Sequence, residues 1–295
     1  MNDNRQIYFF LGKGGVGKST LSALNALKLS KDADTLLISM DPAHNQSDIF
    51  ENKFSEKALS VQNNLAVIEV DIDLWIKRYL QDIQSKISDS YRYLSAINLD
   101  KKFEVLKFSP GLEEYALLLA FETILKKYNS YQYLIFDMPP TALALRFFTL
   151  PTLSLLWIEN LLELRREIID KREIITKIKI GKKSFEQDKV LNKLNELKLQ
   201  YKQLNEQFTD SARIKVNIVM NSDRLSLKES ERISNHLDRL GIHISDIFLN
   251  KVNDTAEDFN SLSSVFKDSS KHIYPRAGYQ LIGLTALNKF LSQID

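Results

Sequence analysis

The sequence contains no cysteine among its 295 residues. Disulfide bonds and thiolate metal sites are therefore excluded within this chain. Histidine is also scarce, and the four histidines are scattered without the spacing of metal ligands: His44, His236, His243 and His272. We therefore expect no zinc site.

The sequence also lacks a strong net charge and long apolar runs. The formal net charge is +2, and 44% of the residues are hydrophobic, as in globular proteins. This charge gives no indication of nucleic-acid binding. Residues 1–6 are polar and precede only five apolar residues, too few for a signal peptide, and no apolar run spans a bilayer. We expect a soluble, cytoplasmic protein.

Short apolar runs recur along the chain, and helical patterns lie between them. The runs predict strands at residues 7–11, 35–40, 65–70, 133–136, 214–220, 244–249 and, more briefly, 272–274. Leu21, Leu24 and Leu27 follow helical spacing after the first run. This alternation predicts an α/β fold with a doubly wound, mostly parallel sheet. We expect one domain spanning residues 1–295.

Two long stretches, at about 72–108 and 142–210, do not fit a compact sheet. Apolar residues recur there at helical steps, and in 194–208 they alternate three and four apart, as in a helix–helix seam. We predict two helical insertions into this single domain. The Lys/Arg excess within 165–202 is either a solvated helix face or an attraction to an anionic surface.

The second stretch opens with a dense apolar segment at 143–162. Pro151 interrupts this segment, which predicts that it is not one straight helix. The apolar side chains either form a groove for a partner helix or only pack against the core and neighbouring helices. The pattern does not decide between these alternatives.

A phosphate-binding loop follows the first predicted strand. The motif G-x-x-x-x-G-K-[ST] is matched by Gly12, Lys13, Gly14, Gly15, Val16, Gly17, Lys18 and Ser19. Its glycines let backbone N–H groups surround phosphate oxygens at the positive end of the next helix. Lys18 can reach the β- and γ-phosphates, and Ser19 can hold Mg²⁺. We therefore predict that residues from Gly12 to Thr20 bind ATP with Mg²⁺.

Three further charged residues are candidates for the same site. Lys13 can neutralise charge on the transferred phosphoryl group, or it is an exposed, solvated lysine. Asp137 ends an apolar run and can support Mg²⁺, or it caps a helix. Asp41 also ends a run and precedes Pro42, so it can orient or deprotonate the attacking water, or it forms a turn.

Together these segments resemble the ATPase family of arsenite pumps and of tail-anchored-protein targeting, a deviant P-loop class with a signature lysine. The stretches that carry the resemblance are 13–19, the first switch at 41–48, 110–114, the second switch at 137–141 with 145–146, 194–210, 227–232, Asn250 and 275–283. The similarity runs nearly from end to end. The first two stretches are the most specific.

The resemblance implies a role for each matching residue. Lys13 would contact phosphates across a subunit interface, Asp41 would position water, and Asp137 would lie behind Mg²⁺. Asn250 would read the adenine edge, with the loop at Pro275 against the base. ATP would close a homodimer whose insertions form an apolar groove for a transmembrane segment, and a membrane receptor is expected.

The sequence departs from this family in two places. Ala142 and Leu143 stand where the second switch usually carries glycine and histidine. No Cys-x-x-Cys pair follows Asn250, so a dimer must be held by other contacts or by nucleotide. The leading hypothesis is a targeting ATPase for tail-anchored membrane proteins. The alternatives are the ATPase subunit of an arsenite-type anion pump, a partition or positioning switch, and a scaffold with very slow turnover.

Overall fold

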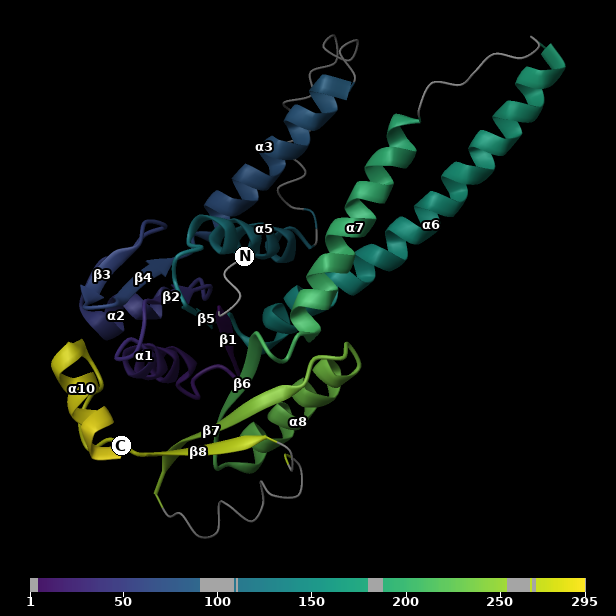
Figure 1. Cartoon of the computed structure of the whole chain (residues 1–295). Coiled ribbons are helices and arrows are strands. Elements are labelled where there is room, and N and C mark those ends of the chain that lie inside the picture. Colours follow the sequence, from purple (N-terminus) through teal and green to yellow (C-terminus); the bar gives the residue numbers. More distant parts are fainter. Residues whose placement is uncertain are drawn as a thin grey trace.

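An eight-stranded sheet forms the centre of the computed structural model, which describes residues 5–90, 109, 111–179, 188–253, 266 and 269–294 (Figure 1). The strands are β1 (Gln6–Leu11), β2 (Thr35–Ser39), β3 (Leu59–Gln62), β4 (Leu65–Glu69), β5 (Tyr133–Asp137), β6 (Ile214–Asn221), β7 (Ile244–Val252) and β8 (Ser270–Pro275). Their order is β3-β4-β2-β5-β1-β6-β7-β8. Every pairing is parallel except that of β3 with β4, so the predicted α/β architecture is confirmed.

Helices connect these strands and cover both faces of the sheet. They are α1 (Lys18–Leu29), α2 (Asn45–Phe50), α3 (Ile72–Ser90), α5 (Leu112–Lys127), α6 (Thr141–Lys179), α7 (Lys189–Thr209), α8 (Arg224–Asp238) and α10 (Gly283–Ile294). Side chains of α1, α2 and α10 pack in one hydrophobic core, and those of α3, α5, α6, α7 and α8 pack in the other. The two cores lie on opposite faces because successive strand residues alternate, as Phe9 and Phe10 do.

The seven predicted strands are all present, and β3 is the one that the sequence patterns missed. This strand has only four residues, none of them buried, and it pairs antiparallel with β4 at the edge of the sheet. An exposed edge strand needs no continuous apolar run, and such a run was the signal that identified the others.

Six phenylalanines join the sheet to the helices of one face. Their ring centroids lie 5.0 to 6.2 Å apart, and all six side chains are buried: Phe9, Phe121, Phe136, Phe147, Phe148 and Phe208. They come from β1, α5, β5, α6 and α7. The bases of the two longest helices are therefore anchored in the same core as the central strands.

Truncating this aromatic cluster is expected to destabilise the protein strongly. Phe208→Ala removes a ring that contacts four other phenylalanines, so we expect the free energy of unfolding to fall by about 3–5 kcal/mol. Chemical denaturation measures this change. Leu225→Ala is the matched control, since Leu225 is 61% exposed, and its effect is expected to stay within about 0.5 kcal/mol. Equal effects of both variants would contradict the packing described here.

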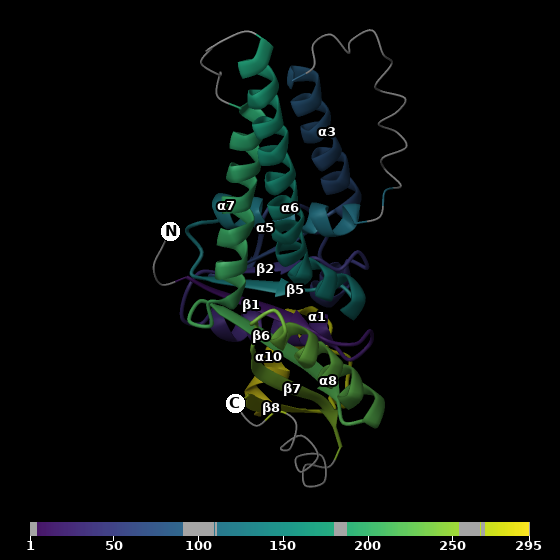
Figure 2. The ribbon, with the colours of Figure 1, turned by 90° about the vertical axis from the view of Figure 1, so that its right-hand side faces the viewer.

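Three helices project away from the sheet on the same side. Figures 1 and 2 both show α3 and the packed pair α6–α7 rising above it, whereas α10 and β8 lie at the opposite end. The predicted insertions are thus helical wherever the structure describes them. Residues 91–108 and 180–187, which belong to those predictions, lie outside the described residues.

Helix α6 continues through Pro151, so the apolar segment belongs to one continuous helix and is not interrupted there. Pro151 cannot donate a hydrogen bond to the preceding turn, but the surrounding packing keeps the helix continuous. Its segment Thr141–Lys171 is long and apolar enough to cross a membrane by length and composition, with 39% of the most apolar window buried. Phe147 and Phe148 anchor the first turns of α6 in the core of the sheet, so the helix begins within the folded domain.

Candidate functional site

The glycine-rich loop lies between β1 and α1, at the carboxyl edge of the parallel strands. Three of its glycines, Gly12, Gly15 and Gly17, have positive φ values that strain any other residue, and at two of them a Cβ would also clash. Gly12 has φ +148°, and a Cβ there would lie 2.2 Å from the carbonyl oxygen of Val219. Gly17 has φ +98°, and its Cβ would lie 2.3 Å from Nδ2 of Asn250. The loop therefore needs glycine at both positions to keep this path.

Helix α1 begins at Lys18, directly after the loop. The side-chain ammonium of Lys18 is buried and donates to the carbonyl oxygen of Lys13 at 3.4 Å. The free N–H groups of the first turn and the positive end of the helix point toward the loop, an arrangement that binds phosphate. Lys13 itself is only partly buried.

A cleft of about 710 Å³ opens beside the loop. It is lined by Gly14, Gly15, Gly17, Lys18, Ser19, Thr20, Asp41, Ala43, Asn45, Asp48, Ile49, Pro140, Asn250, Lys251, Pro275, Arg276, Ala277, Tyr279, Gln280, Leu281 and Ile282. The structure thus brings together the loop, Asp41, Asn250 and Pro275, which sequence analysis placed in one site from widely separated positions. Lys13 is not among the lining residues of this single chain.

The short helix α2 holds the cleft together through Gln46. This side chain is fully buried, and its Nε2 lies 3.0 Å from the Ser19 carbonyl oxygen, 3.2 Å from Ser22 Oγ and 3.0 Å from Asp137 Oδ2. Next to it, Asn45 Nδ2 lies 3.4 Å from Ser19 Oγ. The predicted first switch is therefore tied directly to the two residues predicted to hold Mg²⁺.

Asp137 ends β5 and is completely buried. Because α6 begins only at Thr141, Asp137 does not cap that helix, which was the alternative in the sequence analysis. Burial raises the pKa of Asp137 to about 6, although hydrogen bonds from Ser19 and Gln46 and the charge of Lys18 lower it. Its Oδ1 has no hydrogen-bond partner. An orphaned carboxylate oxygen beside a serine hydroxyl fits Mg²⁺, which binds through few protein oxygens and through substrate phosphates.

The raised pKa of Asp137 predicts a pH-dependent stability of the nucleotide-free protein. The folded state binds this proton more tightly than the unfolded chain, whose carboxyl has its ordinary pKa of 3.8. The stability that this proton contributes is complete below pH 3.8 and disappears as the pH rises through about 6. We expect the difference in the free energy of unfolding between the wild type and Asp137→Asn to fall by up to about 3 kcal/mol between pH 4 and pH 7. Urea titrations across this range test it, and a constant difference would contradict the assignment.

Asp41 follows β2 and is 7% exposed within the cleft. Its Oδ1 accepts a hydrogen bond from the backbone N–H of Ala43 at 3.0 Å. Asp41 thus forms a turn with Ala43 and also lines the cleft, so the two alternatives for this residue do not exclude each other. Met40 N donates to the Asp137 carbonyl oxygen at 2.8 Å, so the ends of β2 and β5 are held side by side.

Asn250 lies on β7 against the loop. Its Nδ2 donates to the Val16 carbonyl oxygen at 2.8 Å, and its Oδ1 accepts from Lys251 N at 2.9 Å. Sequence analysis missed Lys251, whose Nζ donates to the Gly15 carbonyl oxygen at 3.1 Å. It also missed Gln46 and Tyr279 as individual site residues. In this part of the chain the sequence pointed only to Asn250. Residues that reach the site from later strands form no local motif, so the sequence did not reveal them.

Comparison with known proteins agrees with this geometry. The sequence profile of the family described as "Anion-transporting ATPase" matches residues 5–289. The chain is 30% identical to an ATPase GET3 of Lodderomyces elongisporus, covering 98% of this chain and 89% of that protein. It is 30% identical to a protein of Aquifex aeolicus named as an arsenical pump-driving ATPase, covering 84% and 80%. It is 30% identical to an ATPase ASNA1 homolog of Cryptosporidium parvum, covering 89% and 70%.

The family profile covers nearly the whole chain, and the glycine loop and its cleft lie within the matched residues. The chain is therefore an ATPase and belongs to the anion-transporting ATPase family.

Proposed function

We propose that this ATPase is a homodimeric targeting factor, closed by ATP, that binds hydrophobic transmembrane segments of tail-anchored membrane proteins in the cytoplasm. One observation carries the proposal. Large apolar side chains stand exposed along one face of α6: Leu153, Leu156, Trp157, Leu161, Leu164 and Ile168. A contiguous apolar stripe in contact with water usually marks a binding surface, so this observation favours the groove over mere packing.

The second support is a direct connection between this helix and the nucleotide site. Helix α6 begins four residues after Asp137, and its first residue, Thr141, donates through Oγ1 to the carbonyl oxygen of Gly12 at 3.3 Å. A change in the loop on binding or losing the γ-phosphate therefore reaches the start of the apolar helix without any intermediate element. In this proposal the helical stretches 72–108 and 142–210 form the client-binding subdomain.

The mechanism assigns a task to each predicted site residue. The N–H groups of the loop and Lys18 hold the phosphates, and Ser19 and Asp137 hold Mg²⁺, which neutralises charge on the phosphate oxygens when bound. Asp41 orients the attacking water and accepts its proton. Because Lys13 does not line its own cleft, it suits a contact with the nucleotide of a second subunit. Asn250 and Pro275, which line the same cleft, are assigned to the base.

The names of the relatives support this proposal only partly. Two of those compared are called ATPase GET3 or ASNA1 homolog, and one is named for an arsenical pump. A pump role that uses thiolate binding of a metalloid does not suit this sequence, which has no cysteine. The exposed apolar side chains of α6 suit a helical client better.

Binding of a client can be followed with the protein's own tryptophans. The sequence has two, and Trp157 is 66% exposed on the apolar face whereas Trp75 is 7% exposed at the base of α3. In a Trp75→Phe background, a transmembrane-segment peptide is expected to shift the emission of Trp157 to shorter wavelength when ATP–Mg²⁺ is present. An emission that stays the same with every such peptide, in protein that binds ATP, would overturn the targeting function.

A further inference from the structure

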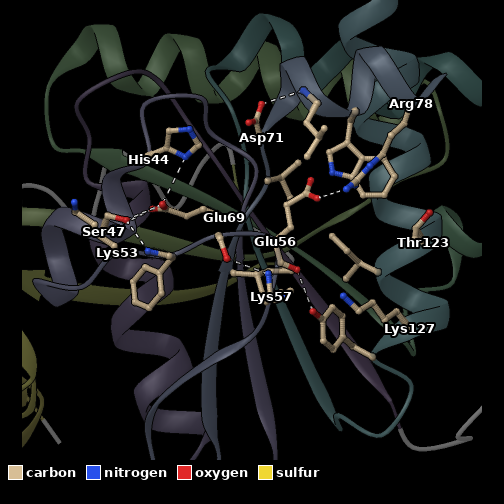
Figure 3. Close-up of a pocket in the computed structure, with 18 residues that line it drawn as sticks. His44, Ser47, Lys53, Glu56, Lys57, Glu69, Asp71, Arg78, Thr123 and Lys127 are labelled. Atoms are coloured by element: carbon tan, nitrogen blue, oxygen red, sulfur yellow. Dashed lines mark hydrogen bonds and ion pairs between the residues drawn. The ribbon is translucent and has the colours of Figure 1, made fainter. Parts of the chain in front are cut away.

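We propose that Glu69, at the end of β4, is a positioning residue for ATP hydrolysis that holds the first switch from behind. This inference rests on the proposed role of Asp41 in the switch. Glu69 does not line the nucleotide cleft. It faces a second cavity of about 880 Å³, and Figure 3 shows it there together with Ser47 and His44.

The carboxylate of Glu69 is bound to the start of α2 by short hydrogen bonds. It is 4% exposed, and it accepts from Ser47 N at 2.8 Å and from Ser47 Oγ at 2.7 Å. His44 Nδ1 lies 3.6 Å from its Oε2. A buried carboxylate is costly unless it is hydrogen-bonded, so these contacts are the reason that a charge is tolerated here.

These contacts replace the cap that α2 lacks. The residue at its N-cap position, His44, has a left-handed backbone with φ 49° and makes no side-chain cap hydrogen bond. The N–H of Ser47 lies in the first turn, where its partner in the adjoining backbone is the carbonyl oxygen of His44 at 3.2 Å, longer than its bond to Glu69. Glu69 accepts from this N–H and places a negative charge at the positive end of the helix, as a capping residue does.

The neighbouring residue of α2 contacts the nucleotide site. Gln46, the residue before Ser47, reaches Ser19 and Asp137, and the helix follows Asp41 by only a few residues. Glu69 and the nucleotide site therefore hold two adjacent residues of one short helix. Loss of the rear contact is expected to disorder the switch, while the loop of Gly12–Ser19, which Glu69 does not contact, keeps its nucleotide-binding form.

Glu56 offers a matched control in the same cavity. It lies across from Glu69 in Figure 3 and pairs with Arg78 at 2.6 Å, in contact with the base of α3 rather than with the switch. Glu69→Gln and Glu56→Gln each remove one negative charge from this cavity. Only the first removes a contact with Ser47.

The test compares turnover with ATP affinity in the full chain. Glu69→Gln is expected to lower kcat about tenfold or more, since hydrogen bonds to a charged group are lost, and to change the equilibrium Kd for ATP less than about threefold. Glu69→Asp keeps the charge and is expected to retain an intermediate kcat. Adding Ser47→Ala to Glu69→Gln is expected to cost little more, because both remove the same contact. Glu56→Gln is expected to hydrolyse ATP as the wild type does.

Three results would overturn the proposal. An unchanged kcat in Glu69→Gln would do so, as would parallel losses of kcat, ATP affinity and melting temperature, which indicate a purely structural residue. An equal loss of kcat in Glu56→Gln would show that the effect comes from removing a negative charge from the cavity and not from the contact with Ser47. Asp41→Asn is measured alongside. Normal turnover in that variant removes the mechanism on which this inference rests, whereas an inactive Asp41→Asn together with normal turnover in Glu69→Gln removes the inference alone.

Discussion

Asp41→Asn is expected to lower the rate of ATP hydrolysis by about a hundredfold or more, while ATP binding persists. The carboxylate lies in the cleft at the end of β2, and asparagine has nearly the same shape. The amide oxygen can still accept from Ala43 N, so the turn is expected to remain. What the substitution removes is the negative charge that orients water and takes its proton. Phosphate release under saturating ATP and equilibrium binding of ATP measure the two properties separately.

Asp48→Asn is the matched control for this prediction. Asp48 lies in α2, lines the same cleft and is exposed, so the substitution removes the same charge from the same neighbourhood. We expect its rate of hydrolysis to stay within about threefold of the wild type, because an exposed charge is screened by solvent. A loss in Asp48→Asn as large as that in Asp41→Asn would show that the cleft responds to charge in general and not to Asp41.

The second large effect is expected on the apolar face of α6. Replacing Leu156, Trp157 and Leu164 together with alanine removes three exposed apolar side chains, of which Leu156 is 60% and Trp157 66% exposed. Burial of one such side chain contributes about 1.5–3 kcal/mol, so the triple variant is expected to bind a transmembrane-segment peptide about a thousandfold more weakly or not at all. The protein's own fold does not depend on these side chains, and a normal melting curve checks this.

The control for the apolar face is a triple alanine variant of Glu159, Glu163 and Arg166. These side chains are also exposed and lie on the same helix, but they follow its polar flank. Glu159 pairs with Lys198 at 2.8 Å, an exposed ion pair that contributes little to stability. Peptide affinity is expected to remain as in the wild type. If the polar triple weakens binding as much as the apolar triple, the peptide is not held by the apolar stripe.

The sequence was most informative where chemistry requires a fixed local pattern. The loop from Gly12 to Ser19 could be predicted because three glycines have unusual backbone angles and Lys18 opens the next helix. The strands could be predicted because a parallel sheet covered on both faces needs continuous apolar runs. Asp41 and Asp137 could be placed together because the ends of parallel strands meet at one edge, as β2 and β5 do.

Contacts between distant segments could not be predicted in this way. The bond of Gln46 to Asp137 joins residues 91 positions apart, and that of Lys251 to Gly15 joins residues 236 apart. Glu69 is part of an apolar strand, and only the fold shows that it caps α2. Pro151 was misleading for the opposite reason, since its local effect on a helix is overridden by packing at the base of α6.

The measurement that tests the central proposal most directly is size-exclusion chromatography with light scattering on Asp41→Asn. The protein is run with and without ATP–Mg²⁺, and with a transmembrane-segment peptide in each case. We expect a dimer that retains the peptide only when ATP–Mg²⁺ is present, because nucleotide closes two subunits whose α6 faces then hold the segment. A protein that stays monomeric under every condition, and that leaves the peptide free, would contradict both the role of Lys13 across an interface and the dimeric groove.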